Sequence, residues 1–212
     1  MDVKFDPDLM RRYNREGPRY TSYPTALQFH EKLTMDDYER EARASPGARR
    51  HEPMSAYVHI PFCFSPCFYC GCNRVITRQA DRALPYLAQL EQEITLRSAC
   101  FDTTRPIEQL HLGGGTPTFM TPGLLEQLLD ALNRRFRLTD DAGRDYSIEI
   151  DPRTVSPEDI RALAGLGFNR VSLGVQDFDP RVQAAVNRIQ PAALARPQAR
   201  PEARPCRRGQ EW

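Results

Sequence analysis

The chain has 212 residues, of which 40% are hydrophobic and 27% are charged, and its formal net charge at pH 7 is +1. This length suffices to bury a hydrophobic core, and the near-zero charge gives no reason to expect binding to nucleic acid or to a membrane surface. The chain lacks a stretch of about eighteen apolar residues, so no membrane-spanning helix is predicted. The first residues, Met1 to Asp6, lack the basic start and apolar stretch of a secretory signal, so we expect a cytoplasmic protein.

Residues 1–54 are polar and irregular, and we expect them to form an N-terminal extension with little regular structure. Within this extension, residues 19–24 favour an extended segment. Residues 34–44 predict a short helix with Thr34 as its N-cap, because a threonine side chain can accept a hydrogen bond from the first helical turn.

From residue 55 to residue 190 the sequence alternates between strand patterns and helix patterns. Short apolar runs predict strands at residues 56–60, 107–112, 146–150 and 170–174. Periodicity and capping residues predict helices at residues 82–99, 122–136, 157–167 and 180–189. Such alternation is typical of parallel βαβ units with right-handed crossovers. We therefore expect an α/β fold with four units, whose functional loops follow the carboxyl ends of the strands.

Two of the predicted helices carry a clear apolar face. These faces consist of Leu84, Leu87, Leu90 and Ile94 in the first helix, and of Leu124, Leu125, Leu128, Leu129 and Leu132 in the second. Thr121 and Ser156 are expected N-caps, because each is followed by a proline at the first helical position. Gly167 is expected to end the third helix, since glycine readily takes the left-handed conformation found there.

The pattern stops at residues 191–212, which we predict to be a disordered tail. This segment reads PAALARPQARPEARPCRRGQEW, and four Pro, five Arg and five Ala make up fourteen of its twenty-two residues. Prolines at this density prevent a regular helix or strand. The abrupt onset of the tail after a well-patterned helix favours a truncation or a frame change in the coding sequence.

Four of the six cysteines lie within ten residues, at Cys63, Cys67, Cys70 and Cys72. A chain of this size without a secretory signal favours metal or redox chemistry over disulfides. The C-x₃-C-x₂-C array can place three thiolates on three corners of an iron–sulfur cube, and the fourth iron is then open for chemistry. The alternative is a structural zinc site with Cys72 as fourth ligand, but zinc sites usually combine two separated C-x₂-C pairs.

Several motifs around this array resemble the oxygen-independent coproporphyrinogen III oxidases (coproporphyrinogen dehydrogenases) of the radical S-adenosylmethionine (SAM) family. The array has an aromatic residue directly before its third cysteine, as in that family. The other matching motifs are PRYTSYPT at 18–25, YVHIPFC at 57–63, CGCN at 70–73, GGGTPT at 113–118 and GVQDF at 174–178. The resemblance covers about residues 9–190 and fails in the tail.

The resemblance implies a partial (β/α) barrel of the radical SAM type, of which this chain holds about four of six βα units in a parallel sheet. The expected domains are the N-terminal extension at 1–54, the incomplete barrel at 55–190 and the tail at 191–212. A [4Fe–4S] cluster bound by Cys63, Cys67 and Cys70 is implied, with SAM at the fourth iron. The implied SAM contacts are Tyr57, Tyr69, Gly114, Gly115, Thr116, Glu149, Gln176 and Arg188. Cys72 matches a cysteine that relatives need for activity and that is not a cluster ligand.

Most of the implied SAM contacts also have a simpler interpretation. The glycine run can be an ordinary turn at a strand end, although glycines allow close backbone approach and leave N–H groups free. Glu149 lies on the face opposite Ile148 and Ile150, and can be a solvated side chain there. Arg188 can be a solvated residue on the surface of the last helix. The alternative roles are core packing for Tyr57 and Tyr69, and a bystander thiol for Cys72. His59 and His111 are expected to be structural, and Cys100 and Cys206 are expected to be uninvolved.

The implied activity is oxidative decarboxylation of coproporphyrinogen III propionates to vinyl groups, which gives protoporphyrinogen IX in anaerobic haem biosynthesis. The implied partners are this substrate, an electron donor for the cluster and an electron acceptor, and we expect a monomer. A haem-binding radical SAM relative is the first alternative, but such relatives usually have Asp-Phe after the array, where this chain has Gly71 and Cys72. The second alternative is an inactive fragment, because family members are roughly twice as long.

Overall fold

The computed structural model describes residues 6–14, 25–44 and 52–191. The expected extended segment at residues 19–24 and the expected disordered tail from residue 192 onward, with Cys206, lie outside the described residues. The chain divides into two compact units, Met1–Glu41 and Ala42–Trp212.

The N-terminal segment forms short helices that begin at side-chain caps. Helix α1 spans Pro7–Tyr13 and is capped by Asp6, whose carboxylate accepts hydrogen bonds from the N–H groups of Asp8 and Leu9. The 3₁₀ turn η1 covers Ala26–Gln28, and helix α2 covers Met35–Ala44. The Thr34 hydroxyl accepts a hydrogen bond from the Asp37 N–H at 3.2 Å, and the Asp37 carboxylate accepts one from the Thr34 N–H at 3.1 Å. The predicted helix and its cap are therefore confirmed.

The second unit is built on a parallel sheet with the strand order β1-β4-β6-β7. These strands span Met54–Ile60, Pro106–Gly114, Asp145–Ile150 and Arg170–Leu173, and the short β5 at Arg137–Leu138 pairs with the start of β4. All four predicted strands are present, and the predicted parallel α/β fold is confirmed. The register places Ile60 beside Gly114 and Glu149 beside Ser172, so the carboxyl ends of the strands meet at one edge of the sheet.

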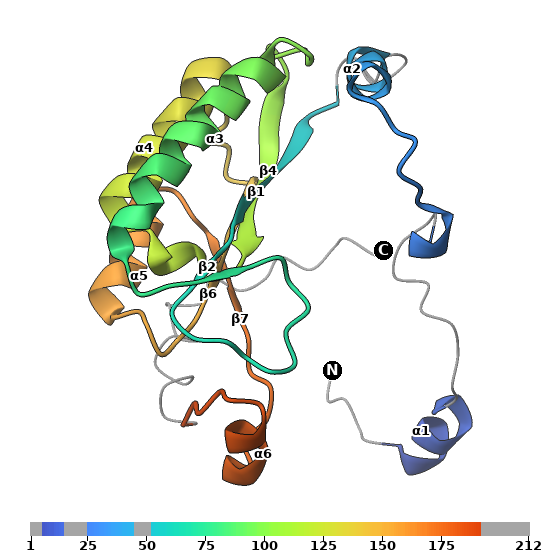
Figure 1. Ribbon diagram of the computed structural model, residues 1–212, viewed down its shortest axis with the longest axis vertical. Coiled ribbons are helices and arrows are strands. Elements are labelled where there is room, and N and C mark those ends of the chain that lie inside the picture. Colours follow the sequence, from blue (N-terminus) through green and yellow to red (C-terminus); the bar gives the residue numbers. More distant parts are fainter. Residues whose placement is uncertain (1–5, 15–24, 45–51, 192–212) are drawn as a thin grey trace. The chain divides into compact units, whose positions relative to one another are not determined.

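Three helices cover one face of this sheet: α3 (Ala83–Ser98), α4 (Pro122–Arg135) and α5 (Pro157–Gly165) (Figure 1). The core between them is apolar, and its fully buried side chains include Ile60, Leu110, Leu112, Leu125, Leu128, Ile148 and Leu163. Because side chains alternate along a strand, the opposite face of β1, β4 and β6 carries polar residues. The sheet thus has an apolar face, which is buried against the helices, and a polar face, which is available for function.

The helix boundaries follow the capping residues that the sequence contains. The Thr121 hydroxyl accepts a hydrogen bond from the Leu124 N–H at 3.4 Å, and Ser156 and Asp159 form a reciprocal capping box. Gly167 has a φ of +97°, and the Phe168 N–H donates to the Leu163 carbonyl at 3.2 Å. This is a Schellman turn, and it ends α5 close to the predicted position.

Two details of the predicted helices are wrong. Leu84 was expected on the buried face of α3 but is 56% exposed, and the adjacent Ala83 is fully buried in the core instead. Helix α6 spans only Pro180–Ala185, although the pattern predicts a helix up to residue 189. Asn187 has a φ of +54°, so a left-handed residue breaks the helix before the end of its apolar pattern.

The segment after β1 holds short elements that the sequence analysis did not predict. Strands β2 (Phe62–Cys63) and β3 (Val75–Ile76) pair in parallel, and the 3₁₀ turns η2 (Ala80–Arg82) and η3 (Pro117–Phe119) precede α3 and α4. The β2–β3 pair closes the base of the cysteine loop. Within the described part of the chain, no helix combines the length and the hydropathy needed to span a membrane.

Candidate active site

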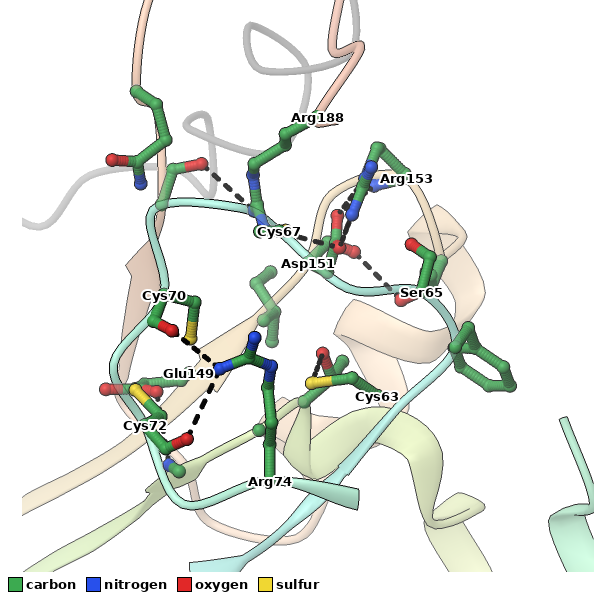
Figure 2. A pocket seen from close by; sticks show the side chains of 18 of the residues that line it. Cys63, Ser65, Cys67, Cys70, Cys72, Arg74, Glu149, Asp151, Arg153 and Arg188 are labelled. Atoms are coloured by element: carbon green, nitrogen blue, oxygen red, sulfur yellow. Dashed lines mark hydrogen bonds and ion pairs between the residues drawn. The ribbon is translucent and has the colours of Figure 1, made fainter. Parts of the chain in front are cut away.

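A cavity of about 460 Å³ lies at the carboxyl ends of the parallel strands. Figure 2 shows side chains from the cysteine loop, from the end of β6 and from the turn after α6 around this space. Its volume falls within the range of about 300–1,000 Å³ that is typical of small-molecule sites. The cavity therefore has both the position and the size of a ligand site in an α/β protein.

The cysteine loop is held by backbone hydrogen bonds at its base and at its tip. At the base, the Val75 N–H donates to the Pro61 carbonyl at 2.8 Å, and the Thr77 N–H donates to the Cys63 carbonyl at 2.9 Å. At the tip, the Phe68 N–H donates to the Val186 carbonyl at 3.0 Å. The loop is thus joined to α6, more than a hundred residues later in the chain, and does not depend on its own sequence alone for its shape.

The three cysteines of the array, together with Cys72, line the cavity. The Thr116 hydroxyl donates to the Cys63 sulfur at 3.7 Å, and the Arg188 Nη1 donates to the Cys67 sulfur at 3.7 Å. Burial raises the pKa of the Cys63 thiol, and a hydrogen bond with Cys70 together with burial raises the pKa of Cys72. Polar groups of the protein thus contact Cys63 and Cys67, while the exposed Cys72 contacts Cys70.

The glycine loop after β4 packs directly against the start of the cysteine loop. The Gly115 N–H donates to the Ile60 carbonyl at 2.9 Å, and the Thr116 N–H donates to the Phe62 carbonyl at 2.7 Å. The Gly114 N–H donates to Glu149 Oε2 at 3.3 Å. The expectation that the glycines leave their N–H groups free is therefore wrong, because these groups join neighbouring strand ends to each other.

Glu149 projects from β6 into the cavity, on the face opposite the buried Ile148 and Ile150, as alternation predicts. Its side chain is 43% exposed, and its Oε1 lies 3.4 Å from the Nε2 of His111 on β4. The Nδ1 of His111 lies 2.7 Å from the Ser147 hydroxyl, and Tyr57 stacks on the His111 ring at 5.7 Å. His111 is therefore part of the polar face that orients Glu149.

Arg188 does not lie on the last helix, as the sequence analysis expected, but in the turn after α6. Its N–H donates to the Gln183 carbonyl at 2.8 Å, which completes a Schellman turn around Asn187. The turn brings its guanidinium to the end of β6, where Nη1 lies 3.6 Å from the Asp151 carboxylate. The interpretation of Arg188 as a solvated surface residue is wrong, because its side chain is only 11% exposed.

Asp151 and Arg153 are two residues of the cavity that the sequence analysis missed. Arg153 forms a forked ion pair with the Asp151 carboxylate, with its Nε at 2.9 and 3.1 Å and its Nη2 at 2.6 Å. Burial alone would raise the pKa of Asp151, but the hydrogen bonds from Arg153 and the charge of Arg188 outweigh it and lower this pKa. The one available signal was their position directly after a predicted strand.

Arg74 is a third missed residue, and its guanidinium lies between Cys63 and the Cys70–Cys72 pair (Figure 2). Its Nη1 donates to the Cys70 carbonyl at 2.6 Å and to the Cys72 carbonyl at 3.4 Å. Its Nε is buried and has no hydrogen-bond partner among the described residues. An unpaired buried donor is costly, so this atom indicates that an acceptor belongs in the cavity.

The structure gathers most of the predicted site residues in one place. The predicted SAM contacts that line the cavity are Tyr69, Gly114, Gly115, Thr116, Glu149, Gln176 and Arg188. Tyr57 lies instead in a neighbouring hollow on the polar face of the sheet, beside Gln109 and His111, and its side chain is 58% exposed. Cys100 is buried in the turn after α3 and does not line the cavity.

The donor set of the cavity fits an iron–sulfur cluster, because three cysteines of one loop line it. Zinc needs four donors that each lie about 2.0–2.3 Å from one point. Three thiolates that ligate separate irons can stand further apart, and the unpaired Arg74 Nε offers a donor for an inorganic sulfide or a carboxylate.

A protein-family model describing the radical SAM superfamily matches residues 57–194. This match covers more than half of the chain, and it includes the cysteine loop, the glycine loop and the turn that carries Arg188. The chain therefore belongs to the radical SAM superfamily. Membership of this superfamily implies a [4Fe–4S] cluster and SAM.

The individual relatives are oxygen-independent coproporphyrinogen III oxidases. The chain is 53% identical to that of Pseudomonas aeruginosa over 188 residues, and 46% identical to that of Escherichia coli over 189 residues. Each match covers 89% of this chain and 40% of the relative. The solved structure of coproporphyrinogen III oxidase from Escherichia coli, a radical SAM enzyme, superposes with a TM-score of 0.76 at 39% identity, and covers 92% of this chain and 42% of that one.

These comparisons confirm the family resemblance and the partial barrel that the motifs indicated. The chain spans about 40% of the length of the curated relatives that it matches. The activity and substrate of those relatives therefore enter below as a proposal for this chain.

Proposed function

We propose that the protein is an oxidoreductase that decarboxylates propionate side chains of coproporphyrinogen III to vinyl groups and so forms protoporphyrinogen IX. The observation that supports this proposal is the single cavity that collects the C-x₃-C-x₂-C cysteines, the glycine loop, Glu149, Gln176 and Arg188. When bound, the cluster and SAM would supply the one-electron and radical chemistry that removal of a hydrogen atom from a propionate requires.

The protein's own contribution is binding and orientation. Cys63, Cys67 and Cys70 hold three irons, and their loop is fixed in place by β3 and α6. Glu149 presents one carboxylate oxygen to Gly114 and the other to His111, so its position is set before any ligand binds. A fixed carboxylate at this place suits the ribose hydroxyls or the ammonium group of SAM.

Most of the remaining proposed SAM contacts line the cavity, and one lies outside it. Tyr69, Gly115, Thr116, Gln176 and Arg188 line the cavity and are proposed to contact SAM there. Tyr57 lines the adjacent hollow, where it stacks on His111, and it is proposed as a further SAM contact. Cys72 is proposed to act in catalysis, and its thiol is exposed and contacts Cys70.

The wider assignments combine this resemblance with the composition and pattern of the chain. The proposed domains remain an N-terminal extension at 1–54, an incomplete barrel at 55–190 and a tail at 191–212. The proposed partners are coproporphyrinogen III, an electron donor and an electron acceptor, and the protein acts as a cytoplasmic monomer without nucleic acid or membrane.

Anaerobic purification followed by reconstitution with iron and sulfide tests the cluster. We expect a brown protein with about four irons per chain, and SAM cleavage when dithionite is added. Serine replacements at 63, 67 and 70 should abolish iron binding, whereas Cys100→Ala should retain it. Iron content that survives all three serine replacements would contradict the assignment.

Product analysis then separates the candidate functions. Conversion of coproporphyrinogen III to protoporphyrinogen IX supports the oxidase. A chain that binds the cluster but never cleaves SAM indicates an inactive fragment. This alternative is specific because the chain covers only 40% of the length of its relatives. Stoichiometric haem binding by the reconstituted protein would instead indicate the haem-binding class.

A further inference from the structure

The cavity contains a buried group of three charged side chains next to one cluster cysteine. Asp151 follows β6 and its side chain is 8% exposed, while Arg153 and Arg188 are 21% and 11% exposed. Figure 2 shows the two guanidinium groups on either side of the Asp151 carboxylate, with Cys67 beside them. The proposed function uses Arg188 as a SAM contact but assigns no role to Asp151 or Arg153.

Each member of this group is held by specific contacts. Asp151 accepts hydrogen bonds from the backbone N–H of Arg153 at 3.0 Å and from its guanidinium at 2.6 Å. Arg188 Nη2 donates to the Gly174 carbonyl at 3.1 Å, and its Nε donates to Gln190 Oε1 at 3.3 Å. The forked Asp151–Arg153 pair and the backbone contacts of Asp151 and Arg188 leave these side chains little conformational freedom. Their geometry is therefore fixed before a ligand binds.

The charges within the group do not balance. One carboxylate faces two guanidiniums, so the three side chains carry a net charge of +1 in a largely buried position. An uncompensated buried charge is strongly unfavourable. A candidate for compensation is the Cys67 sulfur, which lies 3.7 Å from Arg188 Nη1 and also interacts electrostatically with the Arg153 guanidinium.

We propose that Asp151 positions Arg188 and Arg153 against the Cys67 sulfur, and that the surplus positive charge of this group raises the reduction potential of the cluster. Reduction adds one negative charge to the cluster, and a nearby positive charge stabilises the product of that step. Net charge and hydrogen bonds to the sulfurs are two of the factors that set such potentials. This inference rests on the proposed function, because it requires that Cys67 ligates a cluster.

The test is a redox titration of the reconstituted full chain, followed by electron paramagnetic resonance in the absence of SAM. Arg153→Met removes one positive charge, and we expect the midpoint potential to fall. Asp151→Asn removes the negative charge but keeps an oxygen that can accept from both arginines, and we expect the potential to rise. Shifts of opposite sign are specific to a charge effect, since a purely structural role would move both variants in the same direction.

Two further variants act as controls. Arg153→Lys keeps the positive charge, so its potential should stay close to that of the unaltered chain. Arg161→Met removes an exposed arginine of α5 that forms an ion pair with Glu158 on the same helix, and the potential should not change. If Asp151→Asn does not fold, the comparison of Arg153→Met with Arg153→Lys still decides the question.

The possible failures are distinguishable. Absence of iron in the unaltered chain would overturn the proposed function. Full iron content in every variant, with potentials that are unchanged or that shift in the same direction, would overturn the charge-tuning role and leave the cluster assignment intact.

Discussion

Gly115 marks the closest approach between the glycine loop and the chain that leads into the cysteine loop. A Cβ atom built on Gly115 would lie 2.6 Å from the Phe62 carbonyl oxygen and 2.7 Å from the Pro61 carbonyl. These neighbours are backbone atoms of the segment that positions Cys63, so they cannot move without displacing the cysteine. The requirement for glycine here is therefore steric and local to the site.

We predict that Gly115→Ala destabilises the protein by about 1–3 kcal/mol, as is usual for overpacking. Gly123→Ala is the matched control, because a Cβ atom at Gly123 in α4 would meet no atom within 4 Å. Alanine in a helix is favoured over glycine by about 0.5–1 kcal/mol, so the control should be slightly more stable. Urea unfolding followed by circular dichroism measures both changes, and equal midpoints for the two variants would contradict the steric argument.

Asp37 illustrates how a cap residue changes the titration of its partner. Hydrogen bonds from the Thr34 hydroxyl and N–H, with a smaller contribution from Arg40, lower the pKa of Asp37 from 3.8 to about 2. Since the pKa is lowered in the folded protein, the cap stabilises α2 above pH 3.8, and this contribution is lost as the pH falls to about 2. Acid should therefore weaken this end of the helix.

We predict that Thr34→Ala raises the pKa of Asp37 towards 3.8, because the strongest hydrogen bond to the carboxylate is removed. Arg40→Ala should raise it by a smaller amount. A carbon-detected nuclear magnetic resonance titration of the Asp37 carboxyl group gives both values. A larger shift for Arg40→Ala than for Thr34→Ala would show that charge, and not the capping hydroxyl, controls this carboxylate.

At the level of the elements, α3 shows that a helical pattern does not predict the burial of every apolar residue in it. Leu84 and Leu87 are three residues apart and were predicted to share the buried face, yet Leu84 is 56% exposed and Leu87 only 4%. The sheet covers only part of the helix circumference, and at its first turn Ala83 takes the inward position. Periodicity identifies the apolar side of a helix, but the neighbouring element decides where that side is covered.

This difference leads to a direct test. Leu87→Ala should cost about 2–5 kcal/mol of unfolding free energy, because a buried leucine is replaced by a cavity. Leu84→Ala should change the stability by less than about 0.5 kcal/mol, as is usual at exposed positions. Urea unfolding of the full chain measures both values, and equal losses would show that Leu84 is buried after all.

Helix α6 is the element in which tertiary contacts matter most for the site. Its last turn is joined to the cysteine loop by the Phe68 N–H to Val186 carbonyl bond and by the Asn187 side-chain amide, which donates to the Pro66 carbonyl at 2.6 Å. The left-handed Asn187 then directs Arg188 back towards Asp151. A helix that continued to residue 189, as its pattern predicts, would carry Arg188 elsewhere.

At the scale of the whole molecule, the proposed cluster ligands lie in parts of the cysteine loop that are anchored to different elements. Cys63 belongs to β2, whereas Cys67 and Cys70 lie in a loop whose tip is bound to α6. A group that ligates all three would hold the loop in its folded shape. Its binding should therefore be coupled to the stability of the unit that contains the sheet.

We predict that reconstitution with iron and sulfide raises the melting temperature of the chain, because a ligand that binds only the native state stabilises it. For a chain of this size, each kcal/mol of such stabilisation corresponds to roughly 2–4 °C. Anaerobic calorimetry of the loaded and unloaded protein measures the increase. The increase should vanish in the serine variants of Cys63, Cys67 and Cys70, and its persistence there would mean that iron stabilises the protein at another place.

Much of the fold could be predicted before any coordinates, because its determinants are local. Caps such as Thr121 and Ser156 satisfy the first helical turn with their own side chains, and alternation in β6 already separated Glu149 from Ile148 and Ile150. The cysteine spacing and the GGGTPT motif likewise identified residues that the structure brings to one cavity. Each of these inferences needs only a few consecutive residues.

Other features depend on contacts between distant segments and were therefore missed. In the sequence, Asp151 and Arg153 are ordinary polar residues after a strand. Their role becomes visible only in the fold, where Arg188, 37 positions later than Asp151, adds a second ion pair to that carboxylate. Arg74 looks like a solvated loop residue, yet its Nε is buried without a partner among the described residues. The sequence alone was thus enough to predict which cysteines line the cavity and to establish the class of the fold. The packing of β6 against the turn after α6 decided which charges surround the cysteines, because charge pairing across a cavity depends on distances that only the folded chain creates.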